Sequence, residues 1–373
     1  MNLAILGAGQ LGQMLALAGV PLGIKAFFLD PQPDAPGSRV GAQMIADYAD
    51  RAALDRLSTQ CHLATFYFEN VPVDAAAYLE ARIPIHPSPQ ALAQSQDRLR
   101  EKALFRSLGI PTAPFQAVDS LAELVAAVGQ IGLPAILKTR RFGYDGKGQI
   151  WLREPADCAA AWHQLGGQDL ILEGVVAFRR ELSLIAARRP SGETVFYPLA
   201  ENQHRGGVLS MSRPAAPHPA LQAQAEAYGR RLLDQLDYVG VLALELFDCE
   251  TGLLANEFAP RVHNSGHWTI EGAVTSQFEN HLRAILDWPL GETRLTGPCA
   301  MRNCLGTMPD TERVLAIPGA HLHDYGKAPR PGRNLGHVTV RAADEATRDA
   351  RLARVDAVMR LTSGQATLSD TVP

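Results

Sequence analysis

Short apolar runs alternate with helix-patterned segments along the first ninety residues of the chain. A short apolar run with polar ends is typical of a buried strand, and apolar positions at helical spacing are typical of a helix that covers a sheet. The pattern predicts strands at 3–6, 24–29 and 62–66, with helices at 11–18 and 50–58 between them. This alternation of strand, helix and strand favours a parallel sheet.

A charged helix is expected next, at 97–108, because it follows prolines at 84–89 and is followed by Gly109 and Pro111. The segment from Phe115 to Glu173 then predicts a compact α+β insert. Within this insert we expect strands at 115, 135–138, 149–152 and 170–173, and helices at 121–131 and 156–165. After the insert we expect strands at 181–187, 194–198, 241–247 and 253–257, and helices at 219–236, 276–286 and 344–360. The strands 241–247 and 253–257 should form a hairpin around 248–252.

Length and composition limit the class of protein. A chain of 373 residues predicts two or three domains, and 46% apolar with 20% charged residues is typical of a folded protein. A net charge of -4 gives no overall attraction to nucleic acid or to an anionic membrane. Five scattered cysteines without a CxxC pair indicate a reducing compartment, so we expect a cytoplasmic protein without nucleic-acid or membrane partners.

A glycine motif, Gly7-Ala8-Gly9-Gln10-Leu11-Gly12, follows the first strand and opens a helix, and Asp30 ends the next strand. This arrangement is typical of a dinucleotide fold, which makes NAD one reading. The N-terminus of a helix suits any phosphate, and the glycines also permit tight packing of strand and helix. We expect this loop to bind a substrate's phosphate.

A second glycine-rich segment, 142–148, follows Lys138 at the end of a strand. Its N–H groups could close over phosphates beside the fixed charge of Lys138, although the Walker A spacing is absent. An ordinary surface hairpin is the alternative reading.

The predicted hairpin places Glu245 opposite Asn256 or Glu257. Paired carboxylates in an apolar strand need a partner, and oxygen ligands with open positions suit magnesium bridged to nucleotide phosphates. A salt bridge to an arginine is the other reading.

The segment 259–268 after this hairpin is rich in polar groups, which favours a binding loop. His263 and His267 do not fit a zinc motif, because the intervening residues form a poor helix without the glutamate of H-E-x-x-H.

Lys138, the glycine-rich loop, Ile171 to Val176 with Glu181, and the paired carboxylates together resemble the ATP-grasp superfamily. The strings 144–146 and 261–269 narrow the resemblance, over essentially the whole chain, to the 5-(carboxyamino)imidazole ribonucleotide synthases. The resemblance implies an α/β and α+β ATP-grasp fold, with a Rossmann-like pre-ATP-grasp domain at 1–95, an ATP-grasp domain at 96–288 whose small α+β lid spans about 112–176, and a C-terminal α+β domain at 289–373.

The implied reaction uses ATP to phosphorylate bicarbonate. The resulting carboxyphosphate carboxylates the exocyclic amine of 5-aminoimidazole ribonucleotide in purine biosynthesis, and a homodimer is expected. Positions that match ATP contacts are Arg98, Lys138, Gly143, Tyr144, Asp145, Gly146, Lys147, Gly148, Gln149, Glu173, Gly174, Val175, Val176, Glu181, His204, Asn256 and Glu257. Glu245 and Glu257 match magnesium ligands. Positions that match residues facing carboxyphosphate or the ribonucleotide are Asp145, Lys147, Arg261, His263, Asn264, Lys327 and Arg333. We expect the loop from Arg261 to His267 and Lys327 to build one anion pocket in which His263 shuttles the amine proton.

Two positions depart from the family pattern. Tyr67 stands where the first glutamate of E-x-E is usual, and Lys147 stands where arginine is common, so a point charge replaces a bidentate fork. The main alternative is a ligase similar to formate-dependent glycinamide ribonucleotide transformylase. A non-catalytic nucleotide-binding regulator would lack the paired carboxylates, and an NAD oxidoreductase would leave them unexplained.

Overall fold

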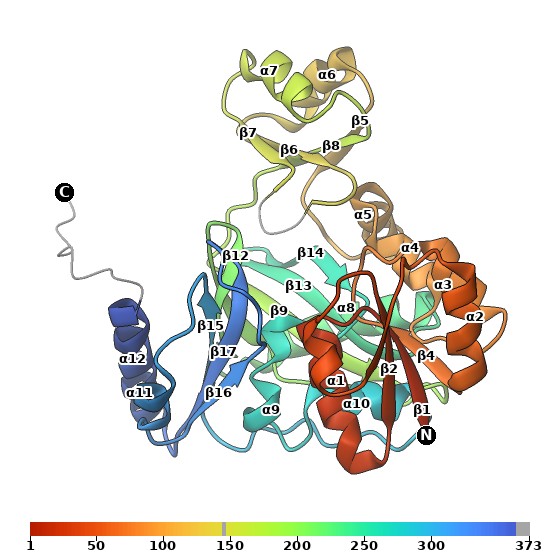
Figure 1. Ribbon diagram of the computed structural model, residues 1–373. Coiled ribbons are helices and arrows are strands. Elements are labelled where there is room, and N and C mark those ends of the chain that lie inside the picture. Colours follow the sequence, from red (N-terminus) through yellow and green to blue (C-terminus); the bar gives the residue numbers. More distant parts are fainter. Residues whose placement is uncertain (144–146, 363–373) are drawn as a thin grey trace.

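The N-terminal part of the protein is a parallel sheet covered by helices. We describe residues 1–143 and 147–362 from a computed structural model (Figure 1). The strands run in the order β3-β2-β1-β4, and all the neighbouring pairs are parallel, as the alternating pattern predicts. The elements are β1 (Asn2–Leu6), α1 (Gln10–Gly19), β2 (Lys25–Asp30), β3 (Ala42–Ile45), α2 (Arg51–Gln60), β4 (Leu63–Phe66), α3 (Val73–Glu80), α4 (Pro89–Ser95) and α5 (Arg98–Ser107). The sequence did not predict β3, α3 or α4, because β3 is short and half-exposed, α3 directly follows Pro72 and α4 begins at Pro89.

A large sheet forms the centre of the molecule and continues into the C-terminal part. Its strands run in the order β14-β13-β9-β11-β12-β15-β17-β16, and β10 pairs with β9. The elements are β9 (Arg180–Arg188), β10 (Thr194–Phe196), β11 (Ala200–Arg205), β12 (Val208–Pro214), α8 (Pro219–Gln235), β13 (Gly240–Cys249), β14 (Gly252–Ala259), α9 (Thr269–Gly272), α10 (Gln277–Ile285), β15 (Cys299–Leu305), α11 (Thr311–Leu315), β16 (Ala320–Asp324), β17 (Asn334–Arg341) and α12 (Glu345–Thr362).

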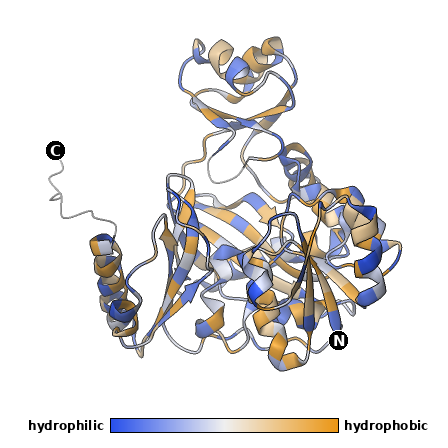
Figure 2. Cartoon of the chain, in the orientation of Figure 1, coloured by the Kyte–Doolittle hydropathy of each residue, from blue (hydrophilic) through white to orange (hydrophobic). Residues whose placement is uncertain are grey.

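Apolar cores lie on both faces of this sheet, and a further core packs its C-terminal strands against α11 and α12. On one face the core joins the sheet to α1 and α10, and on the opposite face it joins the sheet to α5 and α8. In Figure 2 the central strands are predominantly hydrophobic, whereas the surrounding helices mix hydrophobic and hydrophilic stretches. The pair β11 and β12 was missed because polar residues fill β11 and Gly206 and Gly207 separate the strands.

The lid stands above the large sheet as a small α+β unit with its own core (Figure 1). Its antiparallel sheet runs in the order β5-β8-β6-β7. The elements are β5 (Phe115–Val118), α6 (Leu121–Ile131), β6 (Ala135–Thr139), β7 (Gln149–Leu152), α7 (Asp157–Gln164) and β8 (Leu170–Gly174).

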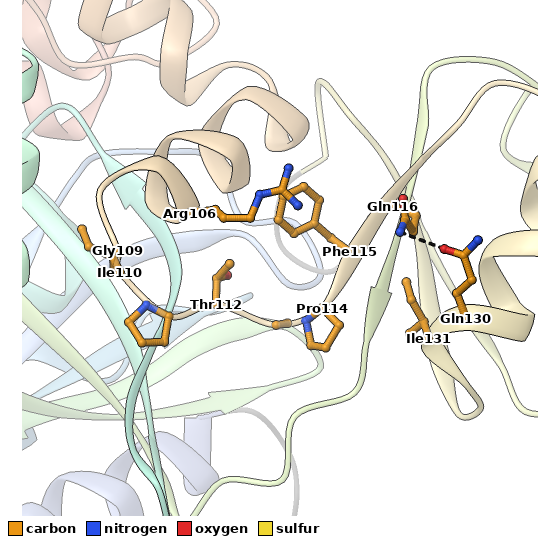
Figure 3. A pocket seen from close by; sticks show the side chains of 11 residues that line it. Arg106, Gly109, Ile110, Thr112, Pro114, Phe115, Gln116, Gln130 and Ile131 are labelled. Atoms are coloured by element: carbon orange, nitrogen blue, oxygen red, sulfur yellow. Dashed lines mark hydrogen bonds between the residues drawn. The ribbon is translucent and has the colours of Figure 1, made fainter.

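The segment that enters the lid is tied to the large sheet. The Thr112 hydroxyl donates a hydrogen bond to the Ala255 carbonyl at 2.8 Å, and the Ala255 N–H donates to the Pro111 carbonyl at 2.7 Å. A cleft of about 750 Å³ lies beside this segment, where Arg106 packs over the Phe115 ring (Figure 3). None of the residues predicted to bind substrate lines this cleft.

Two further observations concern the chemistry of the chain. The five cysteines are free and buried. Among the helices formed by residues 1–143 and 147–362, none is long and apolar enough to cross a membrane.

Candidate active site

A polar cavity of about 540 Å³ lies where the large sheet, the lid and the N-terminal domain meet. The predicted site residues that line it are Arg98, Lys138, Gly143, Gln149, Glu181, His204, Glu245, Asn256, Glu257, Arg261, His263 and Asn264. The sequence therefore predicted residues from distant parts of the chain that share one cavity. The predicted residues Lys147, Gly148, Glu173, Gly174, Val175, Val176, Lys327 and Arg333 are not part of its lining.

A β-bulge in the hairpin of β13 and β14 determines the relative position of the paired carboxylates, Glu245 and Glu257. Leu244 pairs with Phe258 and Leu246 pairs with Ala255, so Glu245 faces both Asn256 and Glu257. The extra residue turns the strand locally and brings these side chains to one place. The predicted position of Glu245 is confirmed. The predicted turn at 248–252 was too long, because Cys249 already pairs with Gly252.

The two carboxylates have different partners. Glu257 accepts a hydrogen bond from Arg98 at 3.0 Å, while Glu245 lies 3.4 Å from Nε2 of His263. Burial and the neighbouring Glu257 raise the pKa of Glu245 to about 8. Although burial acts in the opposite direction, Arg98 and then the nearby lysines lower the pKa of Glu257. Glu257 thus forms the salt bridge to an arginine that was the alternative interpretation of the sequence. That arginine is Arg98, which is itself a predicted nucleotide-binding residue.

A buried clamp of two lysines on one carboxylate joins the lid to α5. Glu173 Oε2 lies 3.0 Å from Lys138 Nζ and 3.6 Å from Lys102 Nζ, and Lys102 also donates to the Asn256 carbonyl at 2.6 Å. Burial alone would raise the pKa of Glu173, but Lys102 and Lys138 hold that pKa at about 2. Glu173 Oε1 is buried and has no hydrogen-bond partner in the described part of the chain.

Sequence reasoning missed Lys102, which looked like one more exposed charge in a charged helix. A signal was present, because Arg98, Lys102 and Phe105 share one helix face at helical spacing and Phe105 is apolar. This face packs on β14, and Lys102 is buried there.

The glycine-rich turn of the lid is described only in part. The Gly143 carbonyl accepts a hydrogen bond from Arg98 at 3.3 Å. Gly148 has φ +70°, and a Cβ there would lie 2.6 Å from the Thr139 hydroxyl, so this position requires glycine. Tyr144, Asp145 and Gly146 lie outside the described residues.

On the far side of the cavity, His204 and Glu181 form a pair on neighbouring strands. Nδ1 of His204 lies 2.5 Å from Glu181 Oε2. Burial would lower the pKa of His204, but the Glu181 carboxylate raises it. Beside this pair, Phe178 stacks on Phe247 with ring centroids 4.7 Å apart. This wall offers flat apolar surface next to charged hydrogen-bonding groups.

The loop after β14 supplies cations and amides. Arg261 lies 3.0 Å from Glu69, and Asn264 Oδ1 is buried without a partner among the described residues. The His263 ring accepts from the Ser265 N–H at 3.3 Å through Nδ1, so its proton is on Nε2, toward Glu245. Burial and Arg261 lower the pKa of His263 well below its usual value.

Lys327 and Arg333 occupy the edge of this region. Lys327 Nζ lies 3.3 Å from Gln10 Oε1, and Gln10 lines the cavity. Arg333 instead donates to the Ala328 carbonyl at 3.2 Å, within its own loop.

The N-terminal glycine motif packs on Tyr67. The Gly9 N–H donates to the Tyr67 hydroxyl at 2.5 Å, and the Ala8 N–H donates to Asp30 at 2.7 Å. Asp30 also accepts from Tyr48 at 3.2 Å, so the carboxylate that would bind a dinucleotide ribose is already engaged. The NAD reading therefore loses its main support.

The donors of the acidic hairpin were tested for a metal site. Within residues 1–143 and 147–362, no three His, Cys, Asp or Glu side chains gather as a metal site. Glu245, Glu257 and the Asn256 amide instead offer a partial set of oxygen donors, which fits a cation that takes its other ligands from a bound phosphate.

Comparison with protein families defines the class of protein. Residues 1–96 match the ribonucleotide synthetase preATP-grasp domain, residues 103–278 match the ATP-grasp domain, and residues 299–351 match the phosphoribosylaminoimidazole carboxylase C-terminal domain. The protein is an ATP-grasp ligase.

Individual relatives narrow this class. The chain is 52% identical to the N5-carboxyaminoimidazole ribonucleotide synthase of Pseudomonas aeruginosa over 96% of its own length and 99% of the relative's. The crystal structure of the Thermus thermophilus synthetase matches with a TM-score of 0.92, 52% identity and coverage of 95% of this chain and 98% of that one. The Aspergillus clavatus enzyme, solved with ADP and 5-aminoimidazole ribonucleotide, matches with a TM-score of 0.89, 31% identity and coverage of 96% and 98%.

The chain belongs to the N5-carboxyaminoimidazole ribonucleotide synthase family, as the resemblance in its sequence predicted. The predicted ATP-grasp fold with its preceding parallel-sheet domain is confirmed. The family also decides against the formate-dependent transformylase alternative.

The packing of the glycine motif predicts unequal costs for two glycine substitutions. Gly7 has φ +100°, and a Cβ there would lie 2.3 Å from the Tyr67 ring. Gly23 has φ +72°, and a Cβ there would have no neighbouring atom within 4 Å. Urea unfolding should show that Gly7→Ala costs about 2–5 kcal/mol, from strain and overpacking, and that Gly23→Ala costs about 1–2 kcal/mol from strain alone. Equal costs would show that Tyr67 does not restrict the motif.

The lysine clamp predicts a stability term that depends on pH. Since the folded pKa of Glu173 is about 2, below its unfolded value, its stabilisation is present above the unfolded pKa and is lost as pH falls toward 2. The difference in unfolding free energy between wild type and Glu173→Gln should therefore shrink, by up to about 3 kcal/mol, between about pH 5 and pH 2. Chemical denaturation across this range measures it, and a difference independent of pH would contradict the clamp.

Proposed function

We propose that this protein joins bicarbonate to the exocyclic amine of 5-aminoimidazole ribonucleotide, with ATP cleaved to ADP and phosphate. One observation carries the proposal: a single cavity brings together the lid lysine Lys138, the carboxylates Glu245 and Glu257, and the loop of Arg261 and His263. A phosphate donor, a small anion and a second substrate could therefore meet in one enclosed place. The related Aspergillus clavatus enzyme was solved with ADP and this ribonucleotide.

The nucleotide would lie between the lid and the large sheet. Lys138 and Arg98 place positive charge where phosphates would lie, and the backbone around Gly143 and Gln149 borders the same space. Phe178 and Phe247 offer a surface for a base. Glu173 keeps its predicted nucleotide contact as a proposal. Gly174, which ends β8, and Val175 and Val176 after it keep their predicted contacts as proposals, as do Tyr144, Asp145 and Gly146.

Magnesium would bind at Glu245 and Glu257, with Asn256 beside them. The raised pKa of Glu245, about 8, reflects burial and the neighbouring Glu257, and a divalent cation would let both carboxylates ionise. When bound, such an ion neutralises charge on the nucleotide phosphates. The donor set supports this assignment.

The reaction proceeds in two steps. A bicarbonate oxygen attacks the γ-phosphorus of ATP, and the bond to ADP breaks. The substrate amine then attacks the carboxyl carbon, the bond from that carbon to the phosphate oxygen breaks, and the released phosphate takes up the proton that the amine loses. Carboxyphosphate reacts with water, so the lid must exclude water between the two steps.

The loop after β14 would hold the transferred group. Arg261 can bind an oxygen pair in a bidentate manner, and Asn264 remains a proposed substrate contact. His263 keeps its predicted place at the reacting centre, but its N–H at Nε2 favours a hydrogen-bond donor over the predicted proton shuttle. Lys147 and Lys327 would add point charges, and Asp145 and Arg333 remain proposed substrate contacts.

The ribonucleotide phosphate would lie at the start of α1, beside the N-terminal glycine motif. The N–H groups of a first helical turn attract anions, although Tyr67 already occupies that of Gly9. Tyr67 therefore takes a packing role where the family's first glutamate is usual.

The wider setting of the enzyme also remains a proposal. The division into 1–95, 96–288 with its lid at 112–176, and 289–373 is supported by the ranges of the matching family domains. The cytoplasmic location is supported by the free, buried cysteines. The homodimer is expected from the family resemblance.

A phosphate-release assay tests the proposed function. Release from ATP and bicarbonate should depend on added 5-aminoimidazole ribonucleotide. Release that responds only to glycinamide ribonucleotide with formate would instead establish the transformylase reaction.

Removing either carboxylate should abolish turnover. Glu257→Gln and Glu245→Gln are each expected to lower kcat by about 100-fold or more, because the amide removes charge from the metal site. The same assay at several magnesium concentrations measures this, with Glu201→Gln on β11 as the control because Glu201 pairs with Arg213 outside the cavity lining. Wild-type kcat at limiting magnesium would refute the metal assignment.

Loss of Lys327 should uncouple ATP cleavage from carboxylation. Lys327→Ala removes a charge that would hold the carboxyl group, so more carboxyphosphate should react with water. The measurement is the ratio of ADP to carboxylated product, with the exposed Lys25→Ala as control. An unchanged ratio with full activity would remove Lys327 from the pocket.

A further inference from the structure

Gln277 was not among the predicted site residues, yet it connects the whole loop after β14. It is the first residue of α10 and is fully buried. Its backbone N–H donates to the Thr269 hydroxyl at 3.0 Å, and that hydroxyl donates to the Gly266 carbonyl at 2.6 Å. The side-chain amide of Gln277 makes the remaining contacts.

Two backbone groups of His263 fix the orientation of this amide. Gln277 Oε1 accepts from the His263 N–H at 2.9 Å, and Gln277 Nε2 donates to the His263 carbonyl at 2.6 Å. A flipped amide would place oxygen against a carbonyl and N–H against N–H. Because the roles of backbone groups are chemically fixed, only one orientation satisfies both contacts.

The oriented amide in turn determines the tautomer of His267. The second N–H of Gln277 lies against Nδ1 of His267, with a distance of 3.2 Å between the nitrogens. Nδ1 must therefore accept, and a neutral ring then carries its proton on Nε2. Burial, followed by the charges of His263, His323 and Arg261, lowers the pKa of His267 well below its usual value, which keeps the ring neutral.

The protonated nitrogen of His267 is the one that remains available to a ligand. His267 lines the polar cavity. Its Nε2 has no hydrogen-bond partner in the described part of the chain and is not fully enclosed by protein atoms. Nε2 of His337, in contrast, is fully enclosed and also lacks a partner. Any hydrogen bond from this ring to a ligand must therefore come from the Nε2–H group.

The glycine of the loop gives independent support for this close packing. A Cβ at Gly266 would lie 2.6 Å from Gln277 Oε1 and 2.9 Å from its Nε2. The string of residues 263–267 thus contains a glycine where the Gln277 amide requires space.

We propose that Gln277 is a positioning residue that locks His267 as an Nε2–H donor, and that this donor binds a carboxylate or phosphate oxygen of the substrates. The inference rests on the proposed function only for the identity of the ligand. His267 would then act as a fixed hydrogen-bond donor, with no part in proton transfer.

The tautomer can be measured without turnover. In full-length protein labelled with ¹⁵N-histidine, long-range proton–nitrogen spectra at neutral pH should show the Nε2–H pattern for His267, assigned by its loss in His267→Phe. In Gln277→Glu the new carboxylate accepts instead of donating, so the His267 signals should shift to an Nδ1-protonated form. An Nδ1–H or averaged pattern in the wild type would overturn the proposal.

Kinetics of two His267 variants test the donor itself. His267→Phe keeps the ring that packs on Phe278 and His337, but it removes the N–H. It should lower kcat/KM for the ribonucleotide, or raise the ratio of ADP to product, by about 10- to 100-fold, as expected for a lost hydrogen bond to a charged group. His267→Gln returns an N–H near the same place and should restore most of the loss.

The two kinetic measurements on His267→Phe identify the ligand, and they remain informative if a Gln277 variant does not fold. An effect on kcat/KM for the ribonucleotide assigns the oxygen to that substrate, and an effect on the ratio assigns it to the carboxyl phosphate. Wild-type behaviour of His267→Phe in both arms would refute the donor role. If wild type makes no carboxylated product at all, the proposed function fails while the tautomer result still stands.

Discussion

The active site depends on one demanding constraint: two carboxylates face each other from adjacent strands inside an apolar sheet. Glu245 and Glu257 meet because a bulge sets one residue of β13 against two of β14. Buried like charges are unfavourable unless cations compensate for them. Arg98 from α5 lies on one carboxylate, and the neutral His263 ring lies on the other. The same groups suit a bound nucleotide, because Arg98 can contact a phosphate and the two carboxylates can bind its metal ion.

A second charged unit joins the lid to this centre. Glu173 ends the lid sheet and lies between Lys138 of the lid and Lys102 of α5, and Lys102 also contacts the backbone of Asn256. The Thr112 contact to Ala255 ties the entry of the lid to the same strand, one residue before Asn256. Lid position and carboxylate position are thus linked through β14, so the residues that would cover the nucleotide and those that would hold its metal share one framework.

Much of this arrangement could be predicted from the sequence where the pattern was strong. The apolar runs of β1, β2 and β4 predicted a parallel sheet, and the predicted hairpin placed Glu245 opposite Asn256 or Glu257. The missed residues, Lys102 and Gln277, sit in helices whose sequences look ordinary. Their burial depends on which elements pack together. For Lys102 the helical spacing with Arg98 and Phe105 was a partial signal, and for Gln277 we find no local pattern that indicates burial. The bulge register and the tautomer of His267 depend on the same tertiary contacts.

Transfer of isotope from bicarbonate tests the central claim most directly, because it follows the bond that the site is proposed to make. If a bicarbonate oxygen attacks ATP, the phosphate released after carboxyl transfer keeps that oxygen. With ¹⁸O-labelled bicarbonate, 5-aminoimidazole ribonucleotide and ATP, mass spectrometry of the phosphate shortly after mixing should show one labelled oxygen. Unlabelled phosphate, formed while carboxylated product accumulates, would contradict the account.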